Sequence, residues 1–193
     1  MAAIKLLAFA GSTRSESFNK KLVQLAATGA RDSGAEVTVI DLSQYPMPLY
    51  DGDLEKESGL PERALAFKQL LIEHHGFLIA SPEYNSSISG VLKNAIDWAS
   101  RPSAPKEPSL IAFKGKTIAL MSASPGALGG LRGLLQLRTT LSTIGTIILP
   151  DQVTIPSAHE AFDEDGNLKA PEKQQAALEL GNKLAEFTKK IQS

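Results

Sequence analysis

The sequence predicts a single α/β domain, residues 1–193, built around a parallel sheet. Short apolar runs alternate with segments of helical periodicity along the chain. Such alternation is typical of βαβ units with right-handed crossovers. The runs at 4–10, 77–81 and 117–124 are almost purely apolar, as expected of strands that helices cover on both faces. A chain of 193 residues is long enough for one full hydrophobic core.

The elements are expected in strict alternation from the N-terminus. Apolar runs predict strands at 4–10, 36–42, 77–81, 117–124 and 145–150. Apolar spacing of three and four residues predicts helices at 19–33, 62–75, 89–100, 128–143 and 171–192. The Pro- and acid-rich stretch 43–62 is predicted to be a long loop, of a length that often carries function. The segment 155–168 is expected to be a surface excursion.

Five such units fit the strand order 2-1-3-4-5 of a doubly wound, flavodoxin-like three-layer sandwich. In that arrangement ligands bind beyond the carboxyl ends of the strands, at the switch point between the first and third strands. The segments 11–19, 82–89 and 122–130 follow the first, third and fourth predicted strands. They are therefore the candidate site.

Composition excludes several classes of function. The formal net charge is −1 and no basic run is present, so no nucleic-acid partner is expected. No stretch approaches the roughly 20 apolar residues of a membrane span. Cysteine is absent, which rules out disulfides and thiolate chemistry and agrees with a cytoplasmic location. The start, MAAIKLLAFA, is interpreted as a core strand rather than a signal peptide, because it is short and contains Lys5.

The first candidate loop, GSTRSESFN at 11–19, is rich in hydrogen-bond donors. It brings a fixed charge, Arg14, and the hydroxyls of Ser12, Thr13, Ser15 and Ser17 to the start of a helix. A helix N-terminus adds unpaired N–H groups and partial positive charge. Together these groups predict a site for a phosphate dianion. The alternative is Ser17 as a simple N-cap, which would need neither the other hydroxyls nor the arginine.

The second and third candidate loops could contact a ligand through backbone groups rather than through charged side chains. In SPEYNSSISG at 81–90, Pro82 forces extended backbone on the preceding residue. The turn at 82–85 could then present N–H and C=O groups to a planar ring, although such a turn needs no ligand. In SASPGALGGLRG at 122–133, three glycines would let the backbone approach a ligand closely, or simply make a flexible loop. Trp98 is expected to pack in the core.

These segments resemble the NADPH-dependent FMN reductase family, which includes flavodoxin-like quinone, azo-dye and chromate reductases. GSTRSESFN is similar to the family's phosphate loop, and SPEYNSSISGVLKNAIDWASRP is similar to its most diagnostic segment. PMPLYDGDLE resembles its loop after the second strand. By this resemblance the FMN phosphate would be bound by Ser12, Arg14, Ser17 and Asn19. The flavin ring would be lined by Pro82, Glu83, Tyr84 and Asn85, with weaker indications for Ser122, Ser124 and Gly126.

The resemblance also implies an activity. NADPH, or NADH, would reduce FMN by hydride transfer, and an acceptor would then take two electrons in a ping-pong cycle without a protein nucleophile. A homodimer or homotetramer with the flavin near the subunit boundary is implied as well. Two other interpretations stay open: a flavodoxin-type electron carrier, and an FMN-binding regulatory module. FMN could be a retained cofactor or a released product.

Other chemistry-bearing residues are interpreted as structural. His74 and His75 end a predicted helix, where cations suit the helix dipole. Asp163 and Asp165 match only part of a calcium loop, because no glutamate stands at the terminal position. His159 is expected to lie on the surface of the protein. Glu83 is expected to pair with a basic residue, which could lie across a subunit interface, and not to act as an acid.

Overall fold

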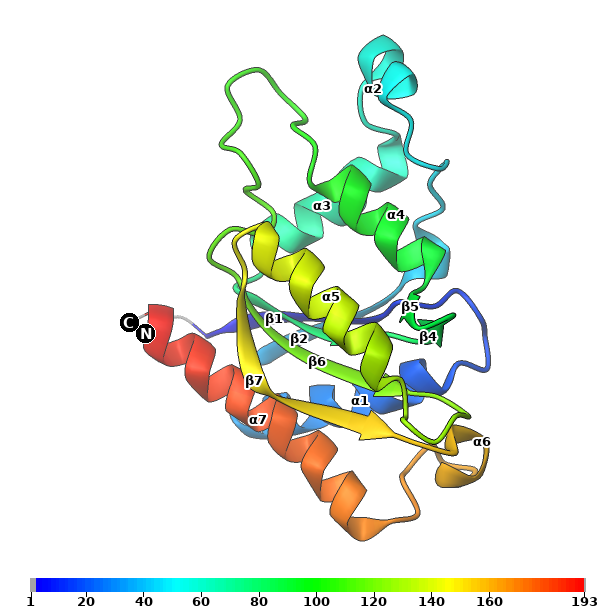
Figure 1. Ribbon diagram of the computed structural model, residues 1–193. Coiled ribbons are helices and arrows are strands. Elements are labelled where there is room, and N and C mark those ends of the chain that lie inside the picture. Colours follow the sequence, from blue (N-terminus) through cyan, green and yellow to red (C-terminus); the bar gives the residue numbers. More distant parts are fainter. Residues whose placement is uncertain (1–2, 193) are drawn as a thin grey trace.

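The computed structural model, which describes residues 3–192, has a five-stranded parallel sheet at its centre (Figure 1). The strand order is β2-β1-β3-β6-β7, so the predicted order is confirmed. The strands are β1 (Lys5–Ala10), β2 (Glu36–Asp41), β3 (Gly76–Ala80), β6 (Thr117–Ala123) and β7 (Ile147–Ile155). Their carboxyl ends share one edge because all the pairs are parallel.

Helices cover both faces of the sheet and complete a three-layer sandwich. One face carries α1 (Phe18–Asp32) and α7 (Pro171–Gln192), and the other carries α3 (Glu62–Glu73), α4 (Gly90–Ala99) and α5 (Leu131–Thr143) (Figure 1). Alternate residues of β1 supply the two cores: Leu6 and Ala8 belong to the first, Leu7 and Phe9 to the second. None of the helices formed by residues 3–192 is long and apolar enough to cross a bilayer.

Two glycines let α1 and α7 approach closely. A Cβ on Gly29 would lie 1.9 Å from the carbonyl oxygen of Leu178, and one on Gly181 would lie 1.8 Å from that of Ala26. Backbone fills both spaces, so neither helix could be substituted there without moving apart. This packing fixes α1, whose first turn reaches the candidate site.

The last strand is longer than predicted. β7 extends to Ile155 rather than ending at residue 150. Its pairing with β6 shifts register between Ile118 and Leu120, so that Leu149, Pro150 and Asp151 form an irregular stretch inside the strand. Proline is tolerated there because β7 is an edge strand and the stretch bulges. The predicted strand at 145–150 therefore covers only the first part of β7.

The predicted loop at 43–62 contains further structure. It begins with the 3-10 turn η1 (Leu42–Gln44) and includes the helix α2 (Gly52–Ser58). We call residues 45–58 the strap, because they lie across α4. Trp98 is fully buried and donates from Nε1 to the carbonyl oxygen of Pro48 at 2.8 Å, which confirms that it packs.

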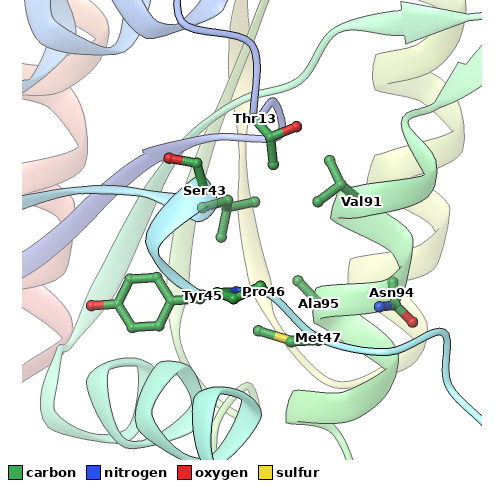
Figure 2. A pocket seen from close by; sticks show the side chains of 9 residues that line it. Thr13, Ser43, Tyr45, Pro46, Met47, Val91, Asn94 and Ala95 are labelled. Atoms are coloured by element: carbon green, nitrogen blue, oxygen red, sulfur yellow. The ribbon is translucent and has the colours of Figure 1, made fainter.

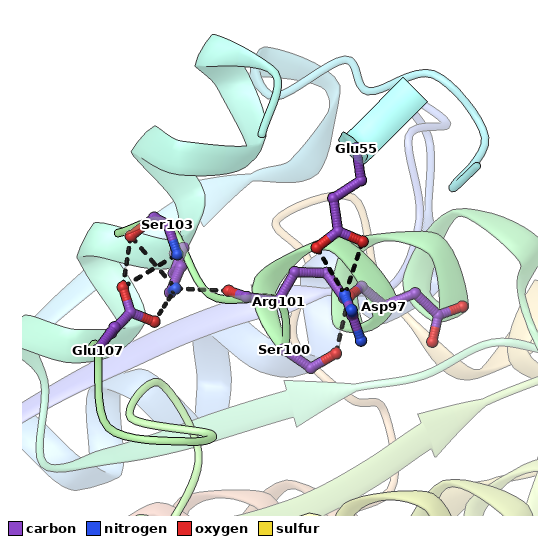
Figure 3. A network of polar contacts seen from close by, with 7 residues as sticks. Glu55, Asp97, Ser100, Arg101, Ser103 and Glu107 are labelled. Atoms are coloured by element: carbon purple, nitrogen blue, oxygen red, sulfur yellow. Dashed lines mark hydrogen bonds and ion pairs between the residues drawn. The ribbon is translucent and has the colours of Figure 1, made fainter. Parts of the chain in front are cut away.

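Two ion pairs hold the strap and the 101–116 connection in place (Figure 3). Arg101 Nε lies 2.9 Å from Glu55 Oε2. Lys68, only 1% exposed, pairs with Glu107 and donates to the carbonyl oxygen of Arg101 at 2.6 Å. Burial alone would raise the pKa of Glu55, but hydrogen bonds from Tyr50 and Arg101 keep that pKa below its ordinary value. A buried lysine is tolerated because a carboxylate and a carbonyl satisfy it.

A small hairpin follows β3 at the candidate site. β4 (Glu83–Tyr84) pairs with β5 (Ser87–Ile88) across the two residues Asn85 and Ser86. Both have positive φ, 51° and 63°, as a two-residue type I′ turn requires. The short helix α6 (Ala158–Ala161) follows β7.

Candidate functional site

The three candidate loops meet at the carboxyl edge of the sheet and enclose a cavity of about 140 Å³. We call it the serine cavity. It is lined by Ser12, Arg14, Ser17, Phe18, Asn19, Pro82, Glu83, Tyr84, Ala123, Ser124 and Pro125. Most of the predicted site residues are therefore brought together. Asn85, Ser122 and Gly126 do not line it.

Donors dominate the α1 side of this cavity. Ser17 occupies the N-cap position of α1, yet its side chain makes no capping hydrogen bond. Its carbonyl oxygen accepts from the N–H groups of Lys20 and Lys21. Within residues 3–192, the N–H groups of Phe18 and Asn19 have no protein acceptor. The Ser17 hydroxyl and this helix end are thus free for an anion, which favours an anion site over the simple cap.

Arg14 is held in position beside these donors. Its guanidinium donates to the carbonyl oxygen of Glu16, and its Cζ lies 5.5 Å from the centre of the Phe18 ring. Its backbone N–H donates to Ser12 Oγ at 3.3 Å. A guanidinium has five N–H donors, so the hydrogen bond to Glu16 leaves other N–H groups of Arg14 for a ligand.

Asn19 has a structural function that its predicted role did not include. Its Nδ2 donates to the carbonyl oxygen of Ala123 at 2.8 Å, and its Oδ1 accepts from the N–H of Ala123 at 2.9 Å. The buried amide therefore ties α1 to the end of β6. Its backbone N–H remains available to the cavity, so contact with a phosphate through that group stays a prediction.

Glu83 is engaged within its own chain. Its Oε1 lies 2.9 Å from a guanidinium nitrogen of Arg132, and its Oε2 accepts from the N–H of Gly133 at 3.0 Å. This pairing corrects the expectation of a partner across an interface. Both contacts tie the β4–β5 hairpin to α5. The Arg132 guanidinium offsets the negative charge of this carboxylate, which reduces its repulsion of an anion in the cavity.

The remaining predicted residues lie apart from the cavity lining. Ser122 is fully buried, and its Oγ, which faces Gly130, has no hydrogen-bond partner among the described residues. Gly126 is exposed and donates its N–H to Ser124 Oγ at 3.3 Å. Asn85 lies in the exposed hairpin turn. Of the loop hydroxyls, Thr13 lines a different cavity.

That second, larger cavity has a volume of about 310 Å³ and lies between the strap, η1 and α4 (Figure 2). We call it the strap cavity. Met47, Val91 and Ala95 face it, with Thr13 at one end. Asn94 also lines it, but its amide is already engaged: Oδ1 accepts from the N–H of Tyr50 and Nδ2 donates to the carbonyl oxygen of Pro48, both at 2.8 Å.

The histidines serve the fold. His74 contacts the carbonyl oxygen of Leu70 at 2.7 Å and Thr38 Oγ1 at 3.0 Å. His75 Nδ1 accepts from the N–H of Lys5 at 2.9 Å, and burial, followed by the Lys116 ammonium, lowers its pKa. These contacts agree with the structural interpretation of His75, but its surroundings disfavour the expected cation. Residues 3–192 contain no group of three or more His, Asp or Glu suited to a metal.

The serine cavity fits the phosphate end of FMN. It combines hydroxyls, a guanidinium and free N–H groups at a helix start, and its one carboxylate is already paired. Its volume is below that typical of a complete ligand pocket, so it suits one end of FMN rather than the whole molecule. The exposed hairpin with Tyr84 borders it. The sequence did not indicate Phe18, Ala123 and Pro125, which adjoin predicted residues in the chain.

Comparison with known proteins identifies the family of the chain. A family described as NADPH-dependent FMN reductase matches residues 4–160. An NAD(P)H-dependent FMN reductase of Pseudomonas aeruginosa is 40% identical over 166 residues, 86% of this chain and 84% of the relative. A 2-hydroxy-1,4-benzoquinone reductase of a Burkholderia species is 35% identical over 167 residues, 86% of each chain.

A solved structure extends the likeness over almost the full chain. The flavoenzyme FerB, an NAD(P)H:(acceptor) oxidoreductase of Paracoccus denitrificans, superposes with a TM-score of 0.78 at 26% identity. The alignment covers 97% of this chain and 98% of FerB. The chain belongs to the NADPH-dependent FMN reductase family.

Proposed function

We propose that this protein is an FMN-dependent oxidoreductase that uses NADPH or NADH to reduce a small acceptor, with quinones as the principal class. One observation carries the proposal. Arg14, Ser17 and the N–H groups at the start of α1 converge on one cavity with donors that the fold leaves unused. The relatives named for FMN and benzoquinone reduction support the choice of cofactor and acceptor.

When bound, FMN would supply the redox chemistry, taking a hydride from the nicotinamide and passing two electrons to the acceptor. The chain's own residues bind and orient. Ser12, Arg14, Ser17 and the first N–H groups of α1 would hold the phosphate dianion. Pro82 and Tyr84 present the hairpin to the ring. No side chain that lines the serine cavity is placed as a nucleophile or a general acid, since Glu83 is paired with Arg132.

The hairpin is a firm platform for a flat ring. Its type I′ turn fixes the backbone, and Glu83 bonds it to Arg132 and Gly133 on α5. The Tyr84 side chain is 56% exposed, so its ring is open to a ligand or a second subunit. A fixed platform would help to hold donor and acceptor at the ~3–3.5 Å separation that hydride transfer requires.

Anaerobic reduction is the test of this function. The protein loaded with FMN is mixed with NADPH or NADH, and bleaching of the flavin absorbance is followed. Quinones, azo dyes, chromate and free FMN are then added in turn. The proposal expects bleaching without a partner reductase and fastest reoxidation by quinones. Bleaching that needs a partner reductase would indicate an electron carrier, and bleaching followed by no acceptor turnover would indicate a regulatory module.

Assembly and cofactor retention complete the proposal. A homodimer or homotetramer working in the cytoplasm is proposed. Light scattering after gel filtration gives the mass of the assembly, and a monomer contradicts this part. Flavin that co-elutes with the protein marks a retained cofactor, whereas a colourless protein fraction marks a released product.

A further inference from the structure

Three flat groups lie one against another beside the serine cavity. The Arg14 guanidinium lies over the Phe18 ring at 5.5 Å, and Phe18 lines the cavity. The Phe18 and Phe162 rings are nearly parallel, with planes 6° apart and centres 6.1 Å apart. The row of contacts therefore runs from a phosphate-loop cation to a residue near the C-terminal helix.

Phe162 is firmly held by the loop that carries it. We call residues 161–169 the C-terminal loop. Phe162 is 8% exposed and pairs with Leu168 in an antiparallel bridge. Asp163 closes the turn: its N–H donates to the carbonyl oxygen of Asn167 at 2.9 Å, and its Oδ1 accepts from the N–H of Asn167 at 2.7 Å. The aspartate that resembled a calcium ligand thus has a structural use.

The C-terminal loop is also fixed to the body of the fold. The N–H of Leu168 donates to Gln174 Oε1 on α7 at 2.9 Å, and the N–H of Lys169 donates to the carbonyl oxygen of Ala161 at 2.9 Å. Phe162 and Leu168 both belong to the core between α1, α7 and the sheet. The Phe162 ring is therefore a rigid surface on which the Phe18 ring rests.

We propose that Phe162 is a positioning residue for the phosphate of FMN, acting on Arg14 through Phe18. This inference rests on the proposed function. Arg14 is exposed, and a long exposed side chain loses conformational freedom when it binds a ligand. Contact with the Phe18 ring restricts the guanidinium before binding, and stacking on Phe162 restricts Phe18. Phe162 lies outside the matched residues 4–160, so family membership alone did not indicate it.

The inference predicts an effect confined to the phosphate. Riboflavin has the same ring system as FMN but no phosphate, so Arg14 has no anion to bind in it. Phe162→Leu keeps an apolar side chain and removes the ring. It is expected to raise the Kd for FMN by about three- to tenfold, the scale of one aromatic contact, and to leave the Kd for riboflavin within about twofold.

Quenching of flavin fluorescence measures both constants for the wild type, Phe162→Leu, Arg14→Ala and the double variant. Phe113→Leu is the matched control, because Phe113 is also buried and in contact with another ring, Phe77, but belongs to the opposite core. Thermal unfolding of each variant checks that it is folded. The control is expected to bind both flavins as the wild type does.

The double variant shows whether Phe162 affects FMN binding through Arg14 or independently of it. If Phe162 acts through Arg14, the Phe162→Leu change has little further effect on FMN binding once Arg14 is alanine. Equal weakening of FMN and riboflavin, or an undiminished effect in the Arg14→Ala background, overturns the inference while the proposed function stands. A folded wild type that binds neither flavin overturns both.

Discussion

The serine cavity and the strap cavity lie on either side of the 11–17 loop, and they differ in size and in the charge of the groups that line them. The strap cavity is the larger, about 310 Å³ against about 140 Å³. Its one amide, Asn94, is bonded at both ends, and none of the described residues that line it is charged. The serine cavity has an arginine, an uncommitted N-cap hydroxyl and a helix start.

Both cavities offer hydroxyl groups, so charge and free backbone N–H groups, rather than volume, favour the serine cavity as the anion site. Neighbouring residues of one loop divide between the two cavities: Thr13 lines the strap cavity, while Ser12 and Arg14 line the serine cavity. The loop therefore separates the two cavities. Substitutions on its two sides should have different effects on FMN affinity.

The largest difference is expected in the free energy of unfolding, between substitutions of Asn19 and of Asn94, whose side-chain amides each bond to another segment of the chain. Asn19 is buried and holds both backbone groups of Ala123, whereas Asn94 is only half-buried and holds the strap. Asn19→Ala should lower the free energy of unfolding by about 2–4 kcal/mol, since it leaves buried groups unpaired. Asn94→Ala should cost about 0.5–1.5 kcal/mol. Urea unfolding measures both, and equal costs would contradict the contrast.

The next effect concerns binding. Arg14→Ala should weaken FMN binding by roughly 1.5–3 kcal/mol, the scale of a charge-assisted hydrogen bond. Thr13→Ala, one residue away, should change FMN affinity by less than about twofold, because its side chain lines the strap cavity. Isothermal titration with FMN compares the two variants. If Thr13→Ala binds as weakly as Arg14→Ala, the two sides of the loop are not distinct.

Blocking each cavity in turn sharpens the comparison. Ser124→Phe places a ring in the serine cavity and should weaken FMN binding about tenfold, near 1.4 kcal/mol. Val91→Phe fills part of the strap cavity and should leave FMN affinity within about twofold of the wild type. The same titration measures both variants. The reverse pattern would place the ligand in the strap cavity.

The smallest expected effect is on the pH dependence of stability, and it concerns His75 at the opposite edge of the sheet. The lowered pKa of His75 means that the folded protein binds the proton less tightly than the unfolded chain does. His75 therefore stabilises the fold fully above its ordinary pKa of about 6.5, and this stabilisation declines as the pH falls below that value. His75→Asn should flatten the decline in thermal stability between about pH 7.5 and 5.5. An unchanged decline would show that His75 does not cause it.

The sequence predicted what periodicity and loop composition can encode. Buried apolar runs indicated all five strands of the sheet, and hydroxyls beside Arg14 indicated the loop that lines the serine cavity. The misses have physical causes. Pro150 hid the second half of β7 because an edge bulge tolerates it. The hydrogen bonds of Asn19 and the Phe162 stack join residues far apart in the chain, which local patterns cannot show.

A crystal structure of the protein with FMN tests the central claim most directly. The account predicts the phosphorus atom in the serine cavity, its oxygens within hydrogen-bond distance of Arg14, Ser17 and the first N–H groups of α1, and the ring over the β4–β5 hairpin. A phosphate bound beside Met47 and Val91, or a serine cavity left empty at saturating FMN, would contradict it.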